Sequence, residues 1–122
     1  MFREVRRNKK QILSEAESRG ILNKATSGVL CVLGDEAYPY GVPMSYGLEG
    51  NRLYFHCMPV GHKVDAIKRH DKVSFTVIET DQIVPEEYTT YFRSVIAFGK
   101  VTFIEEPDEK RRALRILAEK YS

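Results

Sequence analysis

The stretch LYFHCMPVGHK, residues Leu53–Lys63, contains the change of pattern that decides the fold. It begins as an apolar and aromatic run typical of a β-strand, and Pro59 interrupts it. After Gly61, the spacing of Val64 and Ile67 becomes helical. The stretch therefore predicts a strand-to-helix junction, where the free N–H groups of a first helical turn are available to an anion.

The residues before this junction have the pattern of a β-meander. Two turn signals, Gly34-Asp35 and Glu49-Gly50-Asn51, separate runs that are rich in β-branched and aromatic residues. We expect three strands, at about residues 27–34, 39–48 and 51–57.

Beyond the junction the period changes twice. A short helix is expected within residues 60–69, and the alternation of Val73, Phe75 and Val77 predicts a fourth strand over 72–79. The remaining segments are predicted to be an acidic loop over 80–90 and a long strand over 94–106 with a bulge or bend at Gly99.

Helices are expected at both ends of the chain. Apolar residues recur among charges from Arg3 to Arg19, and Gly20 stands where a helix C-terminus favours a left-handed residue. Pro107 opens a last helix, with acidic residues in its first turn and an apolar stripe. The residues of that stripe are Leu114, Leu117 and Tyr121. The whole pattern predicts one domain, residues 1–122, of mainly β (α+β) class: a closed or nearly closed β-barrel with peripheral helices and one inserted helix.

The composition excludes several classes of function. The chain of 122 residues is 43% hydrophobic and 30% charged, with a net charge of only +2, which argues against a dedicated nucleic-acid binder. No run approaches the roughly 18 apolar residues of a membrane span, and no signal-peptide pattern is seen, so we expect a cytoplasmic protein. In that compartment Cys31 and Cys57 are expected to be reduced and buried.

The triplet Gly61-His62-Lys63 at the start of the inserted helix has the chemistry of a phosphate site. Free N–H groups, a favourable helix dipole and the ammonium group of Lys63 would converge on an anion. The same triplet also fits a plain turn with solvated side chains, and the local pattern leaves both interpretations open.

His56 and Cys57 end the preceding strand, but their spacing does not indicate a metal site. Structural zinc sites use closely paired ligands such as C-x2-C, and no such pair occurs in the chain. His56 is either a hydrogen-bonded structural residue or, because it lies near the phosphate candidate, a group that faces a ligand.

The strand from Tyr38 to Tyr46 contains two prolines and a glycine, an unusual composition for the centre of a sheet. Its unpaired backbone groups suit the hydrogen-bonding edge of a flat heteroaromatic ligand. They equally suit an edge strand whose prolines prevent aggregation.

Three segments carry a family resemblance: YPYGVPMSY (38–46), GNRLYFHCMPVGHKVDAIKRHDKVSFTV (50–77) and YFRSVIAFGKVTFIEEPDEKRRALRILAEKYS (91–122). Together they resemble the pyridoxamine-phosphate-oxidase-like flavoproteins, and most of all the nitroimidazole-resistance (Nim-type) branch. The resemblance implies a split β-barrel homodimer that holds two FMN molecules between its subunits. Family members continue past residue 122, so the chain is expected to be short at its C-terminus.

The resemblance also implies roles for individual residues. It places the FMN phosphate on Gly61, His62 and Lys63, and it places His56, with Cys57 beside it, near the flavin ring and the substrate. The strand along the ring consists of Val42, Pro43, Met44, Ser45 and Tyr46. Arg93 and Ser94 match a position that reaches the flavin from the other subunit.

The resemblance predicts an FMN-dependent oxidoreductase that passes electrons from NAD(P)H to a small electrophile such as a nitroaromatic, with His56 as the catalytic residue that positions substrate or delivers a proton. Vitamin B6 oxidation is not expected, because the oxidases proper have Ser-Arg-Lys where this chain has Gly-His-Lys. The alternative is a non-catalytic flavin or haem binder with His56 or His62 as axial ligand. A more distant rival is nucleic-acid binding through the basic first helix.

Overall fold

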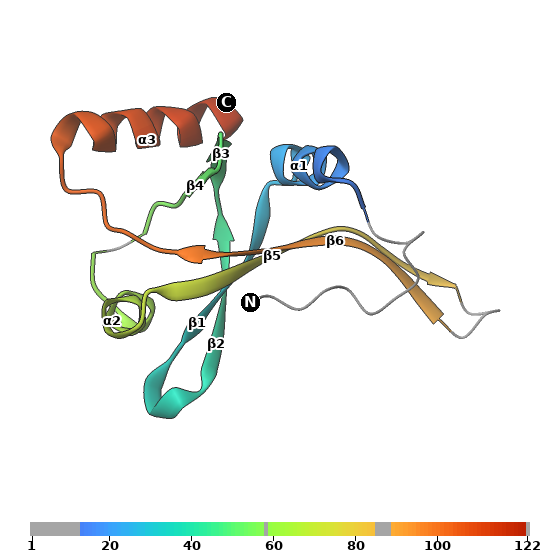
Figure 1. Ribbon diagram of the computed structural model, residues 1–122, viewed down its shortest axis with the longest axis horizontal. Helices are drawn as coiled ribbons and strands as arrows, with labels where there is room; N and C mark the ends of the chain where they lie inside the picture. Colours follow the sequence, from blue (N-terminus) through green and yellow to red (C-terminus); the bar gives the residue numbers. More distant parts are fainter. Residues whose placement is uncertain (1–12, 58, 85–88, 122) are drawn as a thin grey trace.

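The computed structural model describes residues 13–57, 59–84 and 89–121, and it gives the backbone but not the side chains of 80–84 and 89–92. Figure 1 shows the order of the elements along the chain. They are α1 (Glu15–Lys24), β1 (Ser27–Leu33), the 3-10 turn η2 (Asp35–Ala37), β2 (Pro39–Ser45), β3 (Gly47–Glu49), β4 (Arg52–Tyr54), α2 (His62–Arg69), β5 (Lys72–Val84), β6 (Thr89–Lys100) and α3 (Pro107–Tyr121).

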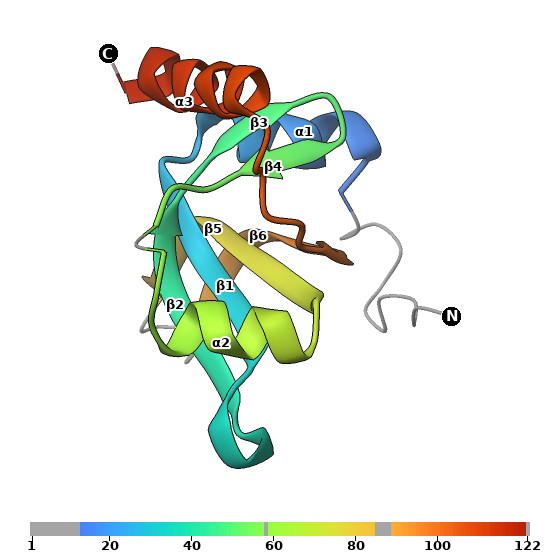
Figure 2. The same cartoon turned by 90° about the vertical axis from the view of Figure 1, so that its left-hand side faces the viewer.

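Two antiparallel sheets make up the β-structure. The larger has the strand order β2-β1-β5-β6, and β3 pairs with β4 in a separate two-stranded sheet. Helix α2 lies against one end of β1, while α3 lies over β3 and β4 (Figures 1 and 2). Strand β2 is therefore an edge strand, with β1 on one side and no described strand on the other.

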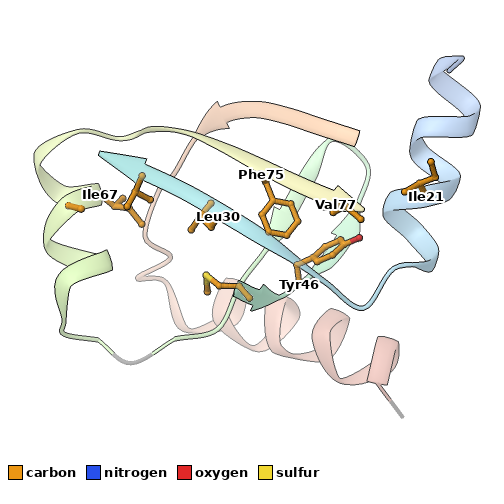
Figure 3. Close-up of a cluster of buried hydrophobic side chains, with 9 residues drawn as sticks. Ile21, Leu30, Tyr46, Ile67, Phe75 and Val77 are labelled. Carbon is orange, nitrogen blue, oxygen red and sulfur yellow. The ribbon is translucent and has the colours of Figure 1, made fainter. Parts of the chain in front are cut away.

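The core lies on one face of the larger sheet. Alternate residues of β1 and β5, among them Leu30, Phe75 and Val77, point into it, because a strand presents every second side chain to the same face. Ile67 of α2 and Ile21 of α1 close the two ends of this layer, as Figure 3 shows. The expected inward face of the fourth strand is confirmed.

The strand expected over residues 39–48 is in fact two strands, because the chain changes sheets at Tyr46. The Tyr46 ring is fully buried beside Phe75, with ring centroids 4.9 Å apart, and its hydroxyl donates to the carbonyl of Leu22. This side chain is thus buried at the point where the backbone leaves the first sheet. The third strand is also shorter than expected and ends at Tyr54.

The expectation of an acidic loop over residues 80–90 is wrong. Strands β5 and β6 form a long hairpin whose pairing extends to Val84 and Thr89 (Figure 1). The bulge expected at Gly99 is also wrong, since Gly99 pairs regularly with Val73 and the register shifts between Ile78 and Thr80 instead. The sequence of this hairpin lacks a clear apolar alternation, so its periodicity does not predict the strands.

Helix α1 continues through Gly20 to Lys24, so the expected helix end at Gly20 is wrong. Ser14 begins the helix with a reciprocal capping box: its hydroxyl accepts from the Glu17 amide, and the Glu17 carboxylate accepts from the Ser14 amide. The part of the expected helix before residue 13 lies outside the described residues. The last helix is confirmed from Pro107, although Ala113 rather than Leu114 is its most buried apolar residue.

Candidate functional site

Helix α2 begins with an open, uncapped turn. Gly61 precedes it with φ 134° and ψ 178°, a conformation that favours glycine, and among the described residues no heavy atom beyond its two chain neighbours lies within 4 Å of where a Cβ would stand. Helix geometry leaves the N–H groups of His62, Lys63 and Val64 without intrahelical acceptors. No described side chain caps these donors, and the Cβ position of the adjacent Gly61 is open.

The other two α-helices of the described chain supply their own caps. Ser14 caps α1, and the Glu106 carboxylate accepts hydrogen bonds from the amides of Asp108 and Glu109 at the start of α3, at 3.0 and 2.8 Å. These bonds lower the pKa of Glu106. At α2 no side chain makes a cap hydrogen bond, so an anion from outside the chain is a chemically suitable cap.

Lys63 is half-buried and lines a cavity of about 1090 Å³. Helices α2 and α3, which lie apart on opposite sides of the molecule in Figure 2, both contribute residues to its lining. Three further residues expected at the site, Met44, His56 and Cys57, line the same cavity. The structure therefore brings these four side chains to one space, with the uncapped turn of α2 beside it.

The walls of this cavity are largely apolar. Phe55, Phe75 and Val101 contribute to them, and α3 adds Leu117. Unbroken runs of residues, 50–57 and 97–105, line the cavity as well, which indicates that backbone edges as well as side-chain faces border it. Such a space suits a flat, partly apolar ligand with hydrogen-bonding edges.

His62 points away from this cavity. Its Nε2 atom accepts a hydrogen bond from the amide of Asp35 at 3.0 Å, and its ring stacks on Tyr40 with centroids 4.2 Å apart. The imidazole thus lies against the turn between β1 and β2. Of the predicted triplet, the side chain of Lys63 reaches the cavity, and His62 is placed to offer its backbone.

The segment from Val42 to Tyr46, which the sequence predicts to lie along the flavin ring, presents two faces. Val42, Met44 and Tyr46 pack toward the core, whereas Pro43 and Ser45 are exposed. The main-chain N–H and C=O of Tyr46 both lie within hydrogen-bond distance of the Tyr121 hydroxyl. The free edge of β2 from Val42 to Ser45 therefore offers better access to a ligand than Tyr46 does.

Arg93 and Ser94 lie at the far end of the larger sheet. Arg93 has carboxylates of its own chain nearby, with nitrogen–oxygen distances of 3.3 Å to Glu79 and 3.7 Å to Glu17. Ser94 is exposed and is paired with Ile78. Neither residue lines the cavity, so the structure separates this pair from Met44, His56, Cys57 and Lys63.

The sequence model of the pyridoxamine 5'-phosphate oxidase family matches residues 14–122 of the chain. The chain belongs to this family. Its architecture is the family's split β-barrel, an α+β fold that is mostly antiparallel sheet, as expected from the sequence.

Solved structures of the same fold include a candidate 5-nitroimidazole antibiotic resistance protein from Bacteroides thetaiotaomicron. It is 32% identical, with a TM-score of 0.80 over 91% of this chain and 68% of that one. An FAD-binding protein from Mesorhizobium loti is 26% identical, with a TM-score of 0.65 over 88% of this chain and 76% of that one. A flavocytochrome from Azotobacter vinelandii is 22% identical, with a TM-score of 0.76 over 88% of this chain and 51% of that one. At this identity the likeness shows the fold alone.

An uncharacterised protein from Rhizobium meliloti is 35% identical over 69 residues, which cover 57% of this chain and 44% of that protein. The match thus spans less than half the length of this curated relative.

Within residues 13–57, 59–84 and 89–121, no helix has the length and apolar character needed to cross a membrane. The same ranges contain no group of three or more His, Cys, Asp or Glu side chains suited to a metal ion.

The sequence did not indicate two residues beside the site, Asp35 and Tyr40. Asp35 appeared only as part of a turn signal, and Tyr40 only as part of a proline-rich strand. Their contacts with His62 join segments 27 and 22 residues apart, and no local pattern encodes such a distance. The sequence shows both residues, but it does not show that both contact the ring of His62.

Proposed function

We propose that this protein is an FMN-dependent oxidoreductase that transfers electrons from NAD(P)H to a small electrophile, such as a nitroaromatic. The observation that carries the proposal is the uncapped, glycine-led start of α2 next to Lys63 and an apolar cavity, within a family whose solved relatives include a flavin-binding protein. The resemblance to the candidate nitroimidazole resistance protein supports the choice of acceptor.

The residues present fit a flavin phosphate. A dianion at Gly61 meets no Cβ, and it would accept hydrogen bonds from the free amides of His62, Lys63 and Val64. The ammonium group of Lys63 would add a charge-assisted contact. Lys63 has no ion pair within the described residues, so no internal partner has to be displaced.

The rest of the cofactor would be held by the edge of β2 and the cavity wall. Backbone groups of Val42 to Ser45 on the unpaired side of β2 suit the polar edge of an isoalloxazine ring. When bound, the ring would supply the redox chemistry by carrying a hydride equivalent from the donor to the acceptor. His56, exposed beside the cavity, would orient the acceptor or exchange a proton with it.

A homodimer is part of the proposal. The face of the larger sheet opposite the core exposes Val29, Ile78 and Ile96, of which Val29 and Ile96 flank Thr76 in one row. An apolar sheet face of this kind is suited to burial against a second copy. Three exposed residues at this face are available to a flavin or a partner: Pro43, Ser45 and Ser94.

The test begins with the absorption spectrum of the purified protein mixed with FMN, followed by anaerobic titration with NADH and NADPH. A bound flavin that is reduced and then reoxidised by a nitroimidazole supports the proposal. A flavin that binds but is never reduced points to the non-catalytic flavin binder, and a Soret band points to the haem binder, with exposed His56 as candidate ligand.

Two variants localise the phosphate. Lys63→Gln removes the ammonium group and should weaken FMN binding on the order of tenfold to a hundredfold. Lys68→Gln, on the same helix and also at the cavity, is the matched control and should bind FMN as the wild type does. Equal weakening in both variants would contradict the assignment to Lys63.

A further inference from the structure

The side chain of His62 has a defined partner away from the proposed cofactor. The Asp35 amide donates a hydrogen bond to Nε2 at 3.0 Å. An imidazole nitrogen that accepts a hydrogen bond carries no proton, so this contact requires the neutral ring, with its proton on Nδ1. One face of the ring stacks on Tyr40 at an interplanar angle of 20°.

The turn between β1 and β2 is shaped to receive this ring. A Cβ on Gly34 would stand 3.0 Å from Nε2 of His62 and 2.9 Å from Cβ of Tyr40, so only glycine leaves enough room. The turn also contains Glu36 and Ala37 at positive φ, 56° and 64°. The close fit indicates that turn and ring are packed as one unit.

Asp35 contacts both ends of helix α2. Its amide bonds His62, the first residue of the helix, and its Oδ1 atom lies 2.9 Å from Nη2 of Arg69, the last residue. A short helix of eight residues is marginal by itself. Contacts at both of its ends fix its position and direction relative to β1.

We propose that His62 is a positioning residue of the anion site: its side chain does not bind the phosphate but fixes the first turn of α2 against Asp35 and Tyr40. The inference rests on the proposed function for its ligand. It assigns phosphate binding to the backbone amides and Lys63, and it replaces the expectation that the side chain of His62 contributes.

A direct phosphate ligand and a positioning residue at His62 predict opposite effects of pH on FMN affinity. A side chain that binds the phosphate by its charge does so as an imidazolium, which binds more tightly at low pH. A positioning residue must be neutral, because protonation turns Nε2 into a donor that faces the Asp35 amide. The groups that face the ring are Tyr40, the Asp35 carboxylate at 3.6 Å and, through that carboxylate, Arg69. The carboxylate pairs with Arg69 already, which limits how far it compensates for the lost amide bond.

Three variants test the proposal. His62→Phe keeps an aromatic ring for Tyr40 but offers no acceptor, and His62→Gln restores an acceptor. His70→Phe, at the other end of α2, is the matched control. We expect the dissociation constant for FMN to rise about tenfold in His62→Phe, to stay within about threefold of wild type in His62→Gln, and to be unchanged in His70→Phe.

Amide hydrogen exchange of Asp35, measured without flavin, is the second readout. The Asp35 amide should exchange slowly in the wild type and in His62→Gln, and quickly in His62→Phe. This measurement stands even if FMN does not bind, in which case the proposed function fails while the positioning contact is still tested. Two results overturn the inference: unchanged Asp35 exchange in His62→Phe, or wild-type binding that tightens relative to His62→Gln as the pH falls from 7.5 to 5.5.

Discussion

The hydroxyl of Tyr121, at the end of α3, lies 2.9 Å from both the amide nitrogen and the carbonyl oxygen of Tyr46. It also lies 2.6 Å from the carbonyl of Thr26. The hydroxyl accepts a hydrogen bond from the Tyr46 amide and has one proton to donate to a carbonyl. This single side chain therefore ties the last helix to the point where the chain passes from β2 to β3.

Replacing Tyr121 by phenylalanine should lower the free energy of unfolding by about 1–3 kcal/mol, because it leaves the part-buried Tyr46 amide without its acceptor. Urea denaturation measures this directly. Tyr38→Phe is the matched control, since Tyr38 is 71% exposed and should tolerate the change. Equal stability of the Tyr121 variant and the wild type would show that water replaces the hydroxyl at no cost.

Two glycine-to-alanine changes should have opposite effects on the free energy of unfolding. Gly61→Ala places a Cβ at φ 134°, a strained conformation, and should destabilise the protein by about 1–3 kcal/mol while weakening FMN binding. Gly20→Ala lies inside α1 with no atom near its Cβ position, and it should stabilise the protein by about 0.4–1 kcal/mol. Thermal unfolding and flavin titration of both variants provide the comparison. A stabilised Gly61→Ala protein with normal FMN affinity would exclude a special role for this glycine.

The sequence predicted those elements that bury one face. In β5 the alternation of Val73, Phe75 and Val77 follows directly from the burial of one face, so the sequence predicts this strand correctly. The hairpin beyond Ile78 was missed, because its strands pair through the backbone and leave no apolar period. The break at Tyr46 was missed because a buried tyrosine continues the β-rich pattern while its tertiary contacts redirect the chain.

The start of α2 was predicted from the sequence, but the directions of its first side chains were not. A glycine before a helical period, followed by lysine, located the start of α2 correctly. Which of His62 and Lys63 faces the cavity depends on the turn at Asp35, which lies 27 residues before His62. Such long-range packing is decided by the whole fold and is not visible in local spacing.

Stability at alkaline pH should depend on Tyr46. Burial, followed by the neighbouring Tyr121, raises the pKa of Tyr46 to about 12. Because this folded-state pKa lies above the unfolded value near 10, the neutral phenol stabilises the fold fully below pH ~10, and this contribution is lost as the pH rises through about 12. Urea denaturation between pH 9 and 12 should show a steeper loss in the wild type than in Tyr46→Phe. Parallel curves would assign the loss to other groups.

The apolar outer face of the larger sheet gives the proposed dimer a direct test. Ile96 is 57% exposed on that face, in register with Thr76 and Val29. Ile96→Asp places a charge where a second copy would bury the side chain, and it should give a monomer in analytical ultracentrifugation.

The flavin content of the same variant separates two arrangements. If the second copy completes the flavin site, Ile96→Asp should lose FMN along with the dimer, although its uncapped α2 and Lys63 are intact. Tyr38→Asp is the matched control, because Tyr38 is 71% exposed in the turn before β2, does not line the cavity, and should leave both the dimer and the FMN content unchanged. A monomeric Ile96→Asp protein that keeps FMN would place the whole flavin site within one subunit. A dimeric Ile96→Asp protein would move the interface to another surface.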